Sequence, residues 1–282
     1  MQPAISIFDA VILGIVEGLT EFLPVSSTGH LILVSEWLGL YNDPAAKAGV
    51  NAFEIVIQSG ALLAVAGIYL PSLRSMANGV LGRDAAGRAL LLQLLAGFLP
   101  AAVIGLLFAG WIKGNLFGVQ PVIFALAGGG ALMLAVEWHH ARKAGSADEA
   151  RLEKPLAAMT WRAALLIGFA QCIAMWPGTS RSMITIVAAR LLGFKPKAAA
   201  EFSFLLALPT LGAATAYDLL KHGPALLEGS GIAGLAVGMA VSFVVAWVAV
   251  KGFLAYLTRH GMAVFGWYRI ALAAVLALTI SF

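Results

Sequence analysis

The chain reads Pro177-Gly178-Thr179-Ser180-Arg181-Ser182-Met183-Ile184-Thr185 within a region whose flanking stretches, 163–176 and 183–194, are almost wholly apolar. A similar break follows Glu17 and Glu21 near the start, where the sequence reads Pro24-Val25-Ser26-Ser27-Thr28-Gly29-His30. A charged side chain at bilayer depth costs about 2.5–3.5 kcal/mol on insertion scales, so it is retained where it faces another polar group, a cavity or a ligand. Two broken apolar segments, one with carboxylates and a histidine and one with an arginine, predict one shared site that handles an anion.

The composition indicates a polytopic membrane protein. Of the 282 residues, 61% are hydrophobic and only 11% are charged, whereas soluble domains carry about 25% charged residues. The net charge of +4 is interpreted as loop charge that sets topology. No nucleic-acid partner is expected, because no basic stripe with interleaved aromatic residues occurs.

A bilayer span needs about 20 apolar residues. Four apolar segments are too short or too interrupted, and they form two pairs, each joined by a turn of Pro, Gly, Ser and Thr residues: 5–22 with 28–40, and 160–176 with 182–193. Because non-helical backbone at membrane depth needs protein or a water-filled cavity around it, each pair is predicted to be a re-entrant helical hairpin. Six other stretches predict full spans, giving an all-α polytopic membrane protein: 52–70, 90–110, 117–138, 202–220, 231–250 and 262–281.

One hairpin followed by three spans occurs twice, which suggests a repeat. Residues 14–27 can be laid on 168–180 with one deletion so that Gly, Glu/Gln, Pro and Ser coincide, with Ser27 on Ser180. Each repeat has an odd number of spans, three, so the second repeat enters the membrane from the opposite side. The halves are therefore predicted to be inverted, as in many transporters. Chance similarity between apolar segments is the alternative. The expected organisation is one membrane domain, 1–282, made of a first repeat (1–138), a solvated cytoplasmic linker (139–160) and a second repeat (161–282).

The positive charges test this topology. With six spans and two hairpins, 13 of the 18 Lys and Arg residues fall in loops on one side, and Lys47, Lys113 and Lys221 fall on the other. The positive-inside rule places the 13 in the cytoplasm. The first hairpin then enters from outside and the second from the cytoplasm, so that their tips can meet near mid-membrane.

Glu17 and Glu21 are four residues apart and therefore share one face of a helix. Two like charges on one face repel each other unless a cation lies between them or one is protonated. A divalent metal and Arg181 are the candidate cations, and carboxylates combined with substrate phosphates are typical of Mg²⁺ sites. A polar pair facing an aqueous vestibule is the alternative.

The first break combines hydroxyl groups with a helix start. Ser26, Ser27 and Thr28 can cap the helix expected over 28–40, whose N-terminal N–H groups and positive dipole end also suit a phosphate. His30 would lie in the first turn as a candidate acid, base or nucleophile. A purely structural histidine is the alternative.

The second break repeats this arrangement with different side chains. Thr179 or Ser180 is expected to cap the next helix, with Arg181 in its first turn, where the guanidinium matches phosphate bidentately. A buried ion pair with a glutamate is the alternative role of Arg181. Ser182 and Thr185, about one turn apart, are expected to add donors or to satisfy local backbone groups. Such a site suits a diphosphate.

One arginine lies outside both breaks. Arg269 follows Tyr268 in the last apolar stretch. It is expected to extend its charged end to the membrane interface, and binding of a lipid phosphate is the alternative.

These motifs also resemble a known family. Glu17-x-x-x-Glu21, the turn 24–30 and the run 177–185 are similar to the two signature regions of the undecaprenyl-diphosphate phosphatase family of the bacitracin-resistance type. Residues 53–69 and 201–209 also resemble it, so the match covers most of the chain. The functional residues that the family implies here are Glu17, Glu21, Ser27, His30, Ser180, Arg181 and Thr185.

The resemblance implies hydrolysis of undecaprenyl diphosphate to the monophosphate carrier lipid of cell-wall synthesis. It also implies a divalent cation, with Mg²⁺ or Ca²⁺ as candidates, and an inverted-repeat fold. The site would open toward the periplasmic side of the bacterial inner membrane. Membrane lipids would surround the protein, and the sequence allows a homodimer.

The resulting hypothesis is a metal-assisted hydrolysis. Arg181 and the helix start at 179–182 hold the diphosphate, Glu17 and Glu21 hold the metal, and Ser27 attacks the terminal phosphorus. His30 or a glutamate takes the proton of Ser27. Attack by a water molecule on the metal, with Ser27 only orienting, and attack by His30 are alternative mechanisms. The rival function is a transporter or flippase for an anionic lipid or solute, without hydrolysis.

Overall fold

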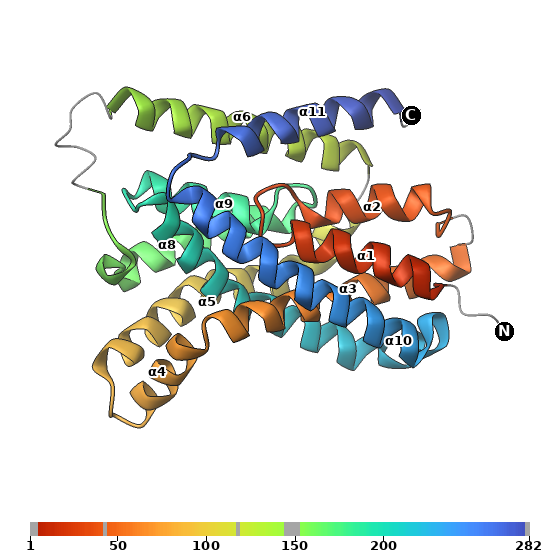
Figure 1. The fold of residues 1–282 in the computed structure, drawn as a ribbon, viewed down its shortest axis with the longest axis horizontal. Helices are drawn as coiled ribbons and strands as arrows, with labels where there is room; N and C mark the ends of the chain where they lie inside the picture. Colours follow the sequence, from red (N-terminus) through yellow and green to blue (C-terminus); the bar gives the residue numbers. More distant parts are fainter. Residues whose placement is uncertain (1–4, 42–43, 117–118, 144–152, 280–282) are drawn as a thin grey trace. The chain divides into compact units, whose positions relative to one another are not determined.

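The computed structural model describes residues 5–41, 44–116, 119–143 and 153–279, and over this part of the chain it is helical throughout, apart from turns and one isolated bridge (Figure 1). The elements in chain order are α1 (Ile7–Thr20), α2 (Ser27–Trp37), α3 (Pro44–Ile68), α4 (Leu70–Val80), α5 (Ala85–Asn115), α6 (Val119–Lys143), the 3-10 turn η1 (Leu156–Ala158), α8 (Trp161–Gln171), the 3-10 turn η2 (Cys172–Met175), α9 (Arg181–Leu191), α10 (Pro196–Leu257) and α11 (Ala263–Thr279). The predicted all-α class is confirmed.

Two pairs of short helices stand where re-entrant hairpins are predicted. Helix α1 packs on α2, and α8 packs on α9. The longest of the four, α1, has 14 residues, and the others have 11. At about 1.5 Å per residue none of them exceeds roughly 21 Å, which is less than the hydrocarbon core of about 30 Å.

The second helix of each pair ends in the same way. Leu40 N–H donates to the carbonyl of Ser35 after α2, and Phe194 N–H donates to the carbonyl of Ala189 after α9. A glycine with positive φ precedes each donor: Gly39 at 71° and Gly193 at 86°. This is the Schellman ending, in which glycine adopts the left-handed conformation at no steric cost. It ends α2 at Trp37, earlier than the expected residue 40.

Among the described residues, five helices are long and apolar enough to cross a membrane: Gly49–Ile68, Ala85–Phe108, Gln120–Arg142, Pro196–Tyr217 and Gly231–Leu257. The last two belong to α10, which is interrupted by non-helical backbone at Gly231 (φ 64°, ψ 156°). The sixth expected span, 262–281, is the 17-residue helix α11, at the lower limit of spanning length.

The chain divides into two compact units, each of which has its own core. The first contains the described parts of Met1–Leu23, Ser27–Leu70 and Ala207–Gly252. Its buried apolar side chains include Leu13, Phe53 and Ile57. Glycines allow α1 to lie close to α10, since a Cβ at Gly18 would come within 2.6 Å of the carbonyl oxygen of Ser242.

The second unit contains the described parts of Pro24–Ser26, Pro71–Leu206 and Phe253–Phe282. Within it α6 and α11 lie side by side, and α5 packs on α8 (Figure 1). The α6–α11 contact is close, because a Cβ at Gly130 would come within 2.7 Å of the carbonyl oxygen of Gly266. Both units take residues from each predicted repeat, so the inverted repeat stays a prediction.

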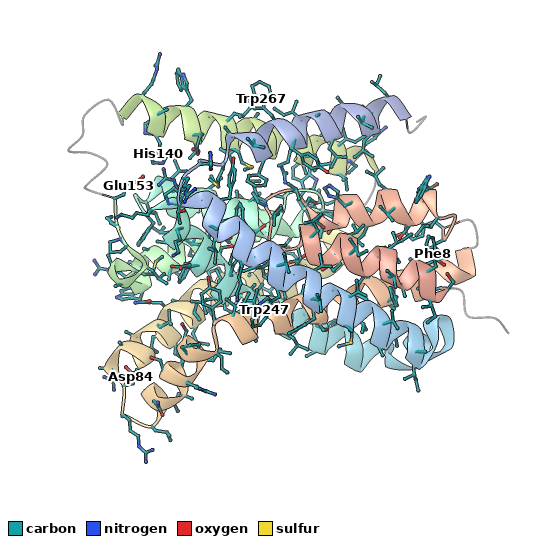
Figure 2. All side chains as sticks on the ribbon, in the orientation of Figure 1. Phe8, Asp84, His140, Glu153, Trp247 and Trp267 are labelled. Carbon is teal, nitrogen blue, oxygen red and sulfur yellow. The ribbon has the colours of Figure 1, made fainter. Side chains whose placement is uncertain are left out.

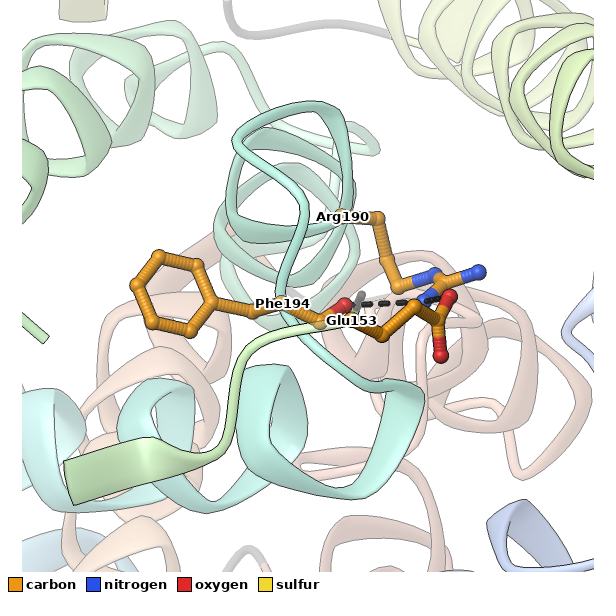
Figure 3. Close-up of polar contacts among 3 residues, drawn as sticks. All are labelled: Glu153, Arg190 and Phe194. Carbon is orange, nitrogen blue, oxygen red and sulfur yellow. Dashed lines mark hydrogen bonds and ion pairs between the residues drawn. The ribbon is translucent and has the colours of Figure 1, made fainter. Parts of the chain in front are cut away.

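The region expected as a solvated linker is held more firmly than the sequence suggests. Helix α6 continues through His139 and His140 to Lys143. Beyond residues 144–152, which lie outside the described part, Arg190 forms an ion pair with Glu153 (2.5 Å) and donates to the carbonyl of Phe194 (2.8 Å) (Figure 3). Residue Glu153 is thereby fastened to the turn between α9 and α10.

Large apolar side chains remain exposed on both units. They include Phe8 (69%) on α1 and Trp267 (64%) on α11 (Figure 2). Lipid tails accept such side chains, whereas a soluble monomer rarely exposes large apolar patches.

The turn between α4 and α5 is polar by contrast, and hydrogen bonds from Ser75 and from the N–H of Gly87 lower the pKa of Asp84. The protein is therefore a multi-pass membrane protein with polar connecting turns.

Candidate functional site

The two glutamates lie at the end of α1 and are buried. Glu17 is 1% exposed and Glu21 is 7% exposed. The backbone N–H of Glu21 donates to the carbonyl of Glu17 at 3.0 Å, so both side chains leave the same face of the last helical turn. The first unit therefore presents two buried carboxylates one turn apart, just before the first break.

The first break turns the chain so that Ser27 faces back to Glu21. Ser26 has φ 75°, and α2 begins at the next residue. The hydroxyl of Ser27 donates to Glu21 Oε2 at 2.6 Å. Of the other predicted residues here, Ser26 is buried, His30 is half-buried in the first turn of α2, and Thr28 is exposed. A hydroxyl bonded to a buried carboxylate is the arrangement of an activated nucleophile.

The second break has the same backbone form. Ser180 has φ 71° and directly precedes α9, and its hydroxyl accepts a hydrogen bond from the N–H of Met183 at 3.2 Å. Of the two expected capping residues, Ser180 therefore caps the helix. Thr179 is buried, and its N–H donates to the carbonyl of Trp176. The hydroxyl of Ser182 lies 3.0 Å from that of Ser180.

The backbone of the first break matches that of the second. The residues that match in backbone conformation are shifted by one position from those that the sequence alignment pairs. Ser26 and Ser180 are the only non-glycine residues with positive φ in the described part of the chain. Each stands immediately before a short helix, so that Ser180 matches Ser26 and Arg181 matches Ser27. The sequence alignment, in which Ser27 coincides with Ser180, differs from this backbone register because it compares side chains and carries no signal of φ. Such conformations cost about 1–3 kcal/mol and persist where the surroundings enforce them.

Arg181 is oriented by a serine of α10 that the sequence analysis missed. Its Nη1 donates to the carbonyl of Ser203 at 3.0 Å. The hydroxyl of Ser203 lies 2.7 Å from Thr185 Oγ1, which also donates to the carbonyl of Arg181 at 2.8 Å. Ser203 is fully buried. It lies in the segment 201–209, for which the sequence shows only a resemblance to the family. A single serine in an apolar run does not by itself predict a functional residue.

Arg269, which the sequence places outside both breaks, is in contact with both of them. The expectation that it extends to the interface is wrong, since it is 0% exposed. Its Nη1 donates to the carbonyl of Pro24 at 3.3 Å, and its Nη2 donates to the carbonyls of Ala125 at 3.0 Å and Gly178 at 2.9 Å. Helices α6 and α11 pack closely through Gly130 and Gly266, which buries the side chain between them. Within the second unit, one guanidinium thus donates hydrogen bonds to backbone carbonyls of both breaks.

The structure places the predicted residues in two clusters. Glu21 and Ser27 form one, in the first unit. Arg181 and Thr185 form the other, in the second unit, with Ser180 and Ser182 bonded to each other beside them. The segment Pro24–Ser26 also belongs to the second unit, and it joins the helix that carries the glutamates to α2.

The donor atoms around the first break suit a hard divalent cation. Glu17 and Glu21 are buried carboxylates one turn apart. Among the described residues, no group of three or more His, Cys, Asp and Glu side chains is placed to hold a metal. A cation on the two glutamates would therefore complete its shell with water and phosphate oxygens, which is typical of Mg²⁺.

Comparisons with known proteins agree with these motifs. A family model described as "Bacitracin resistance protein BacA" matches residues 10–275. The protein named undecaprenyl-diphosphatase in Sorangium cellulosum is 54% identical over 269 residues, which are 95% of this chain and 84% of that protein. The undecaprenyl-diphosphatase of Nitrosospira multiformis is 46% identical over 95% of this chain and 93% of its own. Undecaprenyl-diphosphatase 2 of Rhodospirillum rubrum is 45% identical over 98% and 95%.

Proposed function

The chain belongs to the BacA bacitracin-resistance family, and on this premise we propose that it is an integral membrane phosphatase that hydrolyses undecaprenyl diphosphate to undecaprenyl phosphate and inorganic phosphate. The names of its relatives support this substrate. The product is the carrier lipid recycled for cell-wall synthesis, and the name of the family implies a role in bacitracin resistance. Neither the family nor those names favours a transporter without hydrolysis.

The hydrogen bond from Ser27 to Glu21 carries the mechanistic proposal. At 2.6 Å it lies within the range expected for a nucleophile and its general base. Glu21 accepts the proton as Ser27 Oγ forms a bond to the terminal phosphorus, and the bond from that phosphorus to the bridging oxygen breaks. Undecaprenyl phosphate leaves, and a phosphoserine remains. The oxygen of a water molecule then bonds to the phosphorus, the bond from phosphorus to Ser27 Oγ breaks, and Ser27 Oγ regains the proton from Glu21. Inorganic phosphate is released with the protons of the water. His30 remains the alternative proton acceptor.

Arg181 binds and orients the diphosphate in this proposal. A guanidinium matches phosphate oxygens bidentately, and the hydrogen bond to Ser203 fixes its direction. The N-termini of α2 and α9 add N–H groups and positive dipole ends, which favour phosphate. The hydroxyls of Ser26, Thr28, Thr179, Ser180, Ser182 and Thr185 stay predictions as substrate contacts.

Glu17 and Glu21 are proposed to hold a divalent cation. When bound, such a cation neutralises negative charge that develops on the phosphoryl oxygens. The support is the pair of buried carboxylates, which a cation would stabilise because like charges on one helix face repel each other.

We propose the bacterial inner membrane as the location, with the site reached from the periplasmic side. The support is the positive-inside rule, which assigns the basic loops to the cytoplasm. The homodimer that the sequence allows stays a prediction.

The test is release of inorganic phosphate from undecaprenyl diphosphate by the purified protein in detergent. We expect turnover that EDTA abolishes and that added Mg²⁺ or Ca²⁺ restores. Glu21→Gln removes the proton acceptor and is expected to lower kcat at least 100-fold, because general bases contribute about 10²–10⁴-fold. Absence of phosphate release from the folded wild-type protein, together with lipid movement in liposomes, would contradict the proposal.

A further inference from the structure

Arg269 stands out among the buried charged residues because its contacts are all backbone carbonyls. It is fully buried, and it makes no ion pair with any described residue. Arg190, which is also buried in the second unit, instead pairs with Glu153 as well as with the Phe194 carbonyl (Figure 3). A guanidinium presents five N–H donors in a fixed planar fork. Arg269 uses this fork to hold carbonyls from three separate segments of the chain.

Two of these carbonyls occupy equivalent places in the two breaks. Pro24 lies two residues before Ser26, and Gly178 lies two residues before Ser180. Each of these positive-φ serines directly precedes a short helix, α2 or α9. The third carbonyl, of Ala125, belongs to α6. One guanidinium therefore binds the same backbone position of both serine turns and fixes them to a spanning helix.

We propose that Arg269 is a positioning residue that sets the serine turn 24–26 and the serine turn 178–180 in a fixed mutual arrangement. This inference rests on the proposed function, since the first turn leads into Ser27 and the second into Arg181. Arg269 acts through the two carbonyls and touches neither the substrate nor the reacting atoms. A displacement of about 1 Å between reacting groups can reduce a rate about 100-fold, so the arrangement of the turns controls the chemical step.

Neighbouring glycines of α6 offer a matched pair of variants. A Cβ at Gly129 would overlap Arg269 Nη2 and would come within 2.8 Å of Met183 Cε, whereas a Cβ at Gly128 would meet no atom within 4 Å. The Met183 side chain is flexible and can move aside. The guanidinium is held by carbonyls and can retreat only by lengthening those hydrogen bonds. Gly129→Ala thus disturbs the position of Arg269 without removing its charge.

The first readout is steady-state hydrolysis of undecaprenyl diphosphate. We expect Gly129→Ala to lower kcat about 10-fold and Arg269→Gln to lower it about 100-fold, with KM changing less than about threefold in both. Arg269→Lys, which keeps the charge and some donors, should lie between wild type and Arg269→Gln. Gly128→Ala, Met183→Ala and the buried-arginine control Arg190→Gln should keep kcat within about twofold per folded molecule.

The second readout needs no substrate. Hydrogen exchange of the wild type and the variants is measured by mass spectrometry on peptides that cover 22–28 and 176–182. Gly129→Ala and Arg269→Gln should speed exchange in both segments together, because one side chain restrains both turns. Arg190→Gln should speed exchange around residue 194 instead.

The proposal is overturned if folded Gly129→Ala and Arg269→Gln keep wild-type kcat, or if exchange rises in only one of the two turns. If Arg269→Gln fails to fold, the comparison of Gly129→Ala with Gly128→Ala decides. A wild-type protein that releases no phosphate would refute the proposed function. The exchange measurement would still test the positioning role, so the two failures can be told apart.

Discussion

The break 24–30 and the break 177–185 have the same backbone form but carry different side chains. In both, a serine with positive φ precedes a helix of 11 residues, and a glycine of positive φ lies two residues beyond the end of that helix. The first helical residue is Ser27 in one break and Arg181 in the other. One backbone form therefore presents two kinds of side chain: a hydroxyl beside a carboxylate at the first break, and a guanidinium, proposed to bind phosphate, at the second.

The hydrogen-bond partners of Ser27 and Arg181 also differ in their chemistry. Ser27 is bonded to the carboxylate of Glu21, which can take a proton. Arg181 is bonded to the carbonyl of Ser203, which can only orient it. A reaction that depends on both tasks should respond unequally to loss of each group.

Loss of the Ser27 hydroxyl should have the largest effect. Ser27→Ala removes the proposed nucleophile, and we expect kcat to fall at least 1,000-fold, as when other covalent catalysts lose theirs. The measurement is phosphate release per folded molecule. Ser242→Ala, which removes a buried hydroxyl of α10 that has no hydrogen-bond partner among the described residues, is the control and should keep wild-type turnover. Substantial activity of Ser27→Ala would leave attack by water or by His30 as the mechanism.

Changes at Arg181 should rank second. Arg181→Ala is expected to lower kcat/KM about 100- to 1,000-fold, because it removes the charge that is proposed to stabilise the transition state. Arg181→Lys keeps the charge but not the planar fork, so it should restore only part of the loss. Kinetics with undecaprenyl diphosphate measure both variants. Near-wild-type turnover of Arg181→Ala would remove the arginine from the mechanism.

Ser203→Ala should have the smallest effect of the three. It removes the hydroxyl that lies 2.7 Å from Thr185 Oγ1 and accepts a long hydrogen bond from Arg181 Nη1 at 3.5 Å, but it keeps the carbonyl that accepts from Arg181 at 3.0 Å. We expect kcat/KM to fall about 3- to 10-fold, since only the fixation of the arginine is weakened. Ser242→Ala in the same helix is again the control. Equal kinetics for Ser203→Ala and Ser242→Ala would show that Ser203 has no part in orienting Arg181.

Much of the scaffold follows from the sequence. The length of an apolar run, a Pro or Gly turn and a charged residue at bilayer depth are local signals, and they predict both short helix pairs and most of the spans. The capping role of Ser180 follows from its place before an apolar helix.

The roles of Arg269 and Ser203 could not be predicted in this way. Arg269 binds carbonyls that lie 245, 144 and 91 residues away in the chain, and no local pattern reports such partners. General experience with arginines in apolar helices favours extension to the interface. The sequence also does not predict which residues of the two breaks match in backbone conformation, because this depends on the φ values of Ser26 and Ser180.

A double-mutant cycle between Ser27 and Arg181 tests most directly whether the two breaks act on one diphosphate. The free energies of activation are compared for Ser27→Ala, Arg181→Ala and the double variant, all measured by phosphate release from undecaprenyl diphosphate. Groups that serve one transition state are strongly non-additive, so the double variant should be little slower than the slower single variant. Fully additive losses would show that the hydroxyl and the guanidinium act independently and would contradict the shared site.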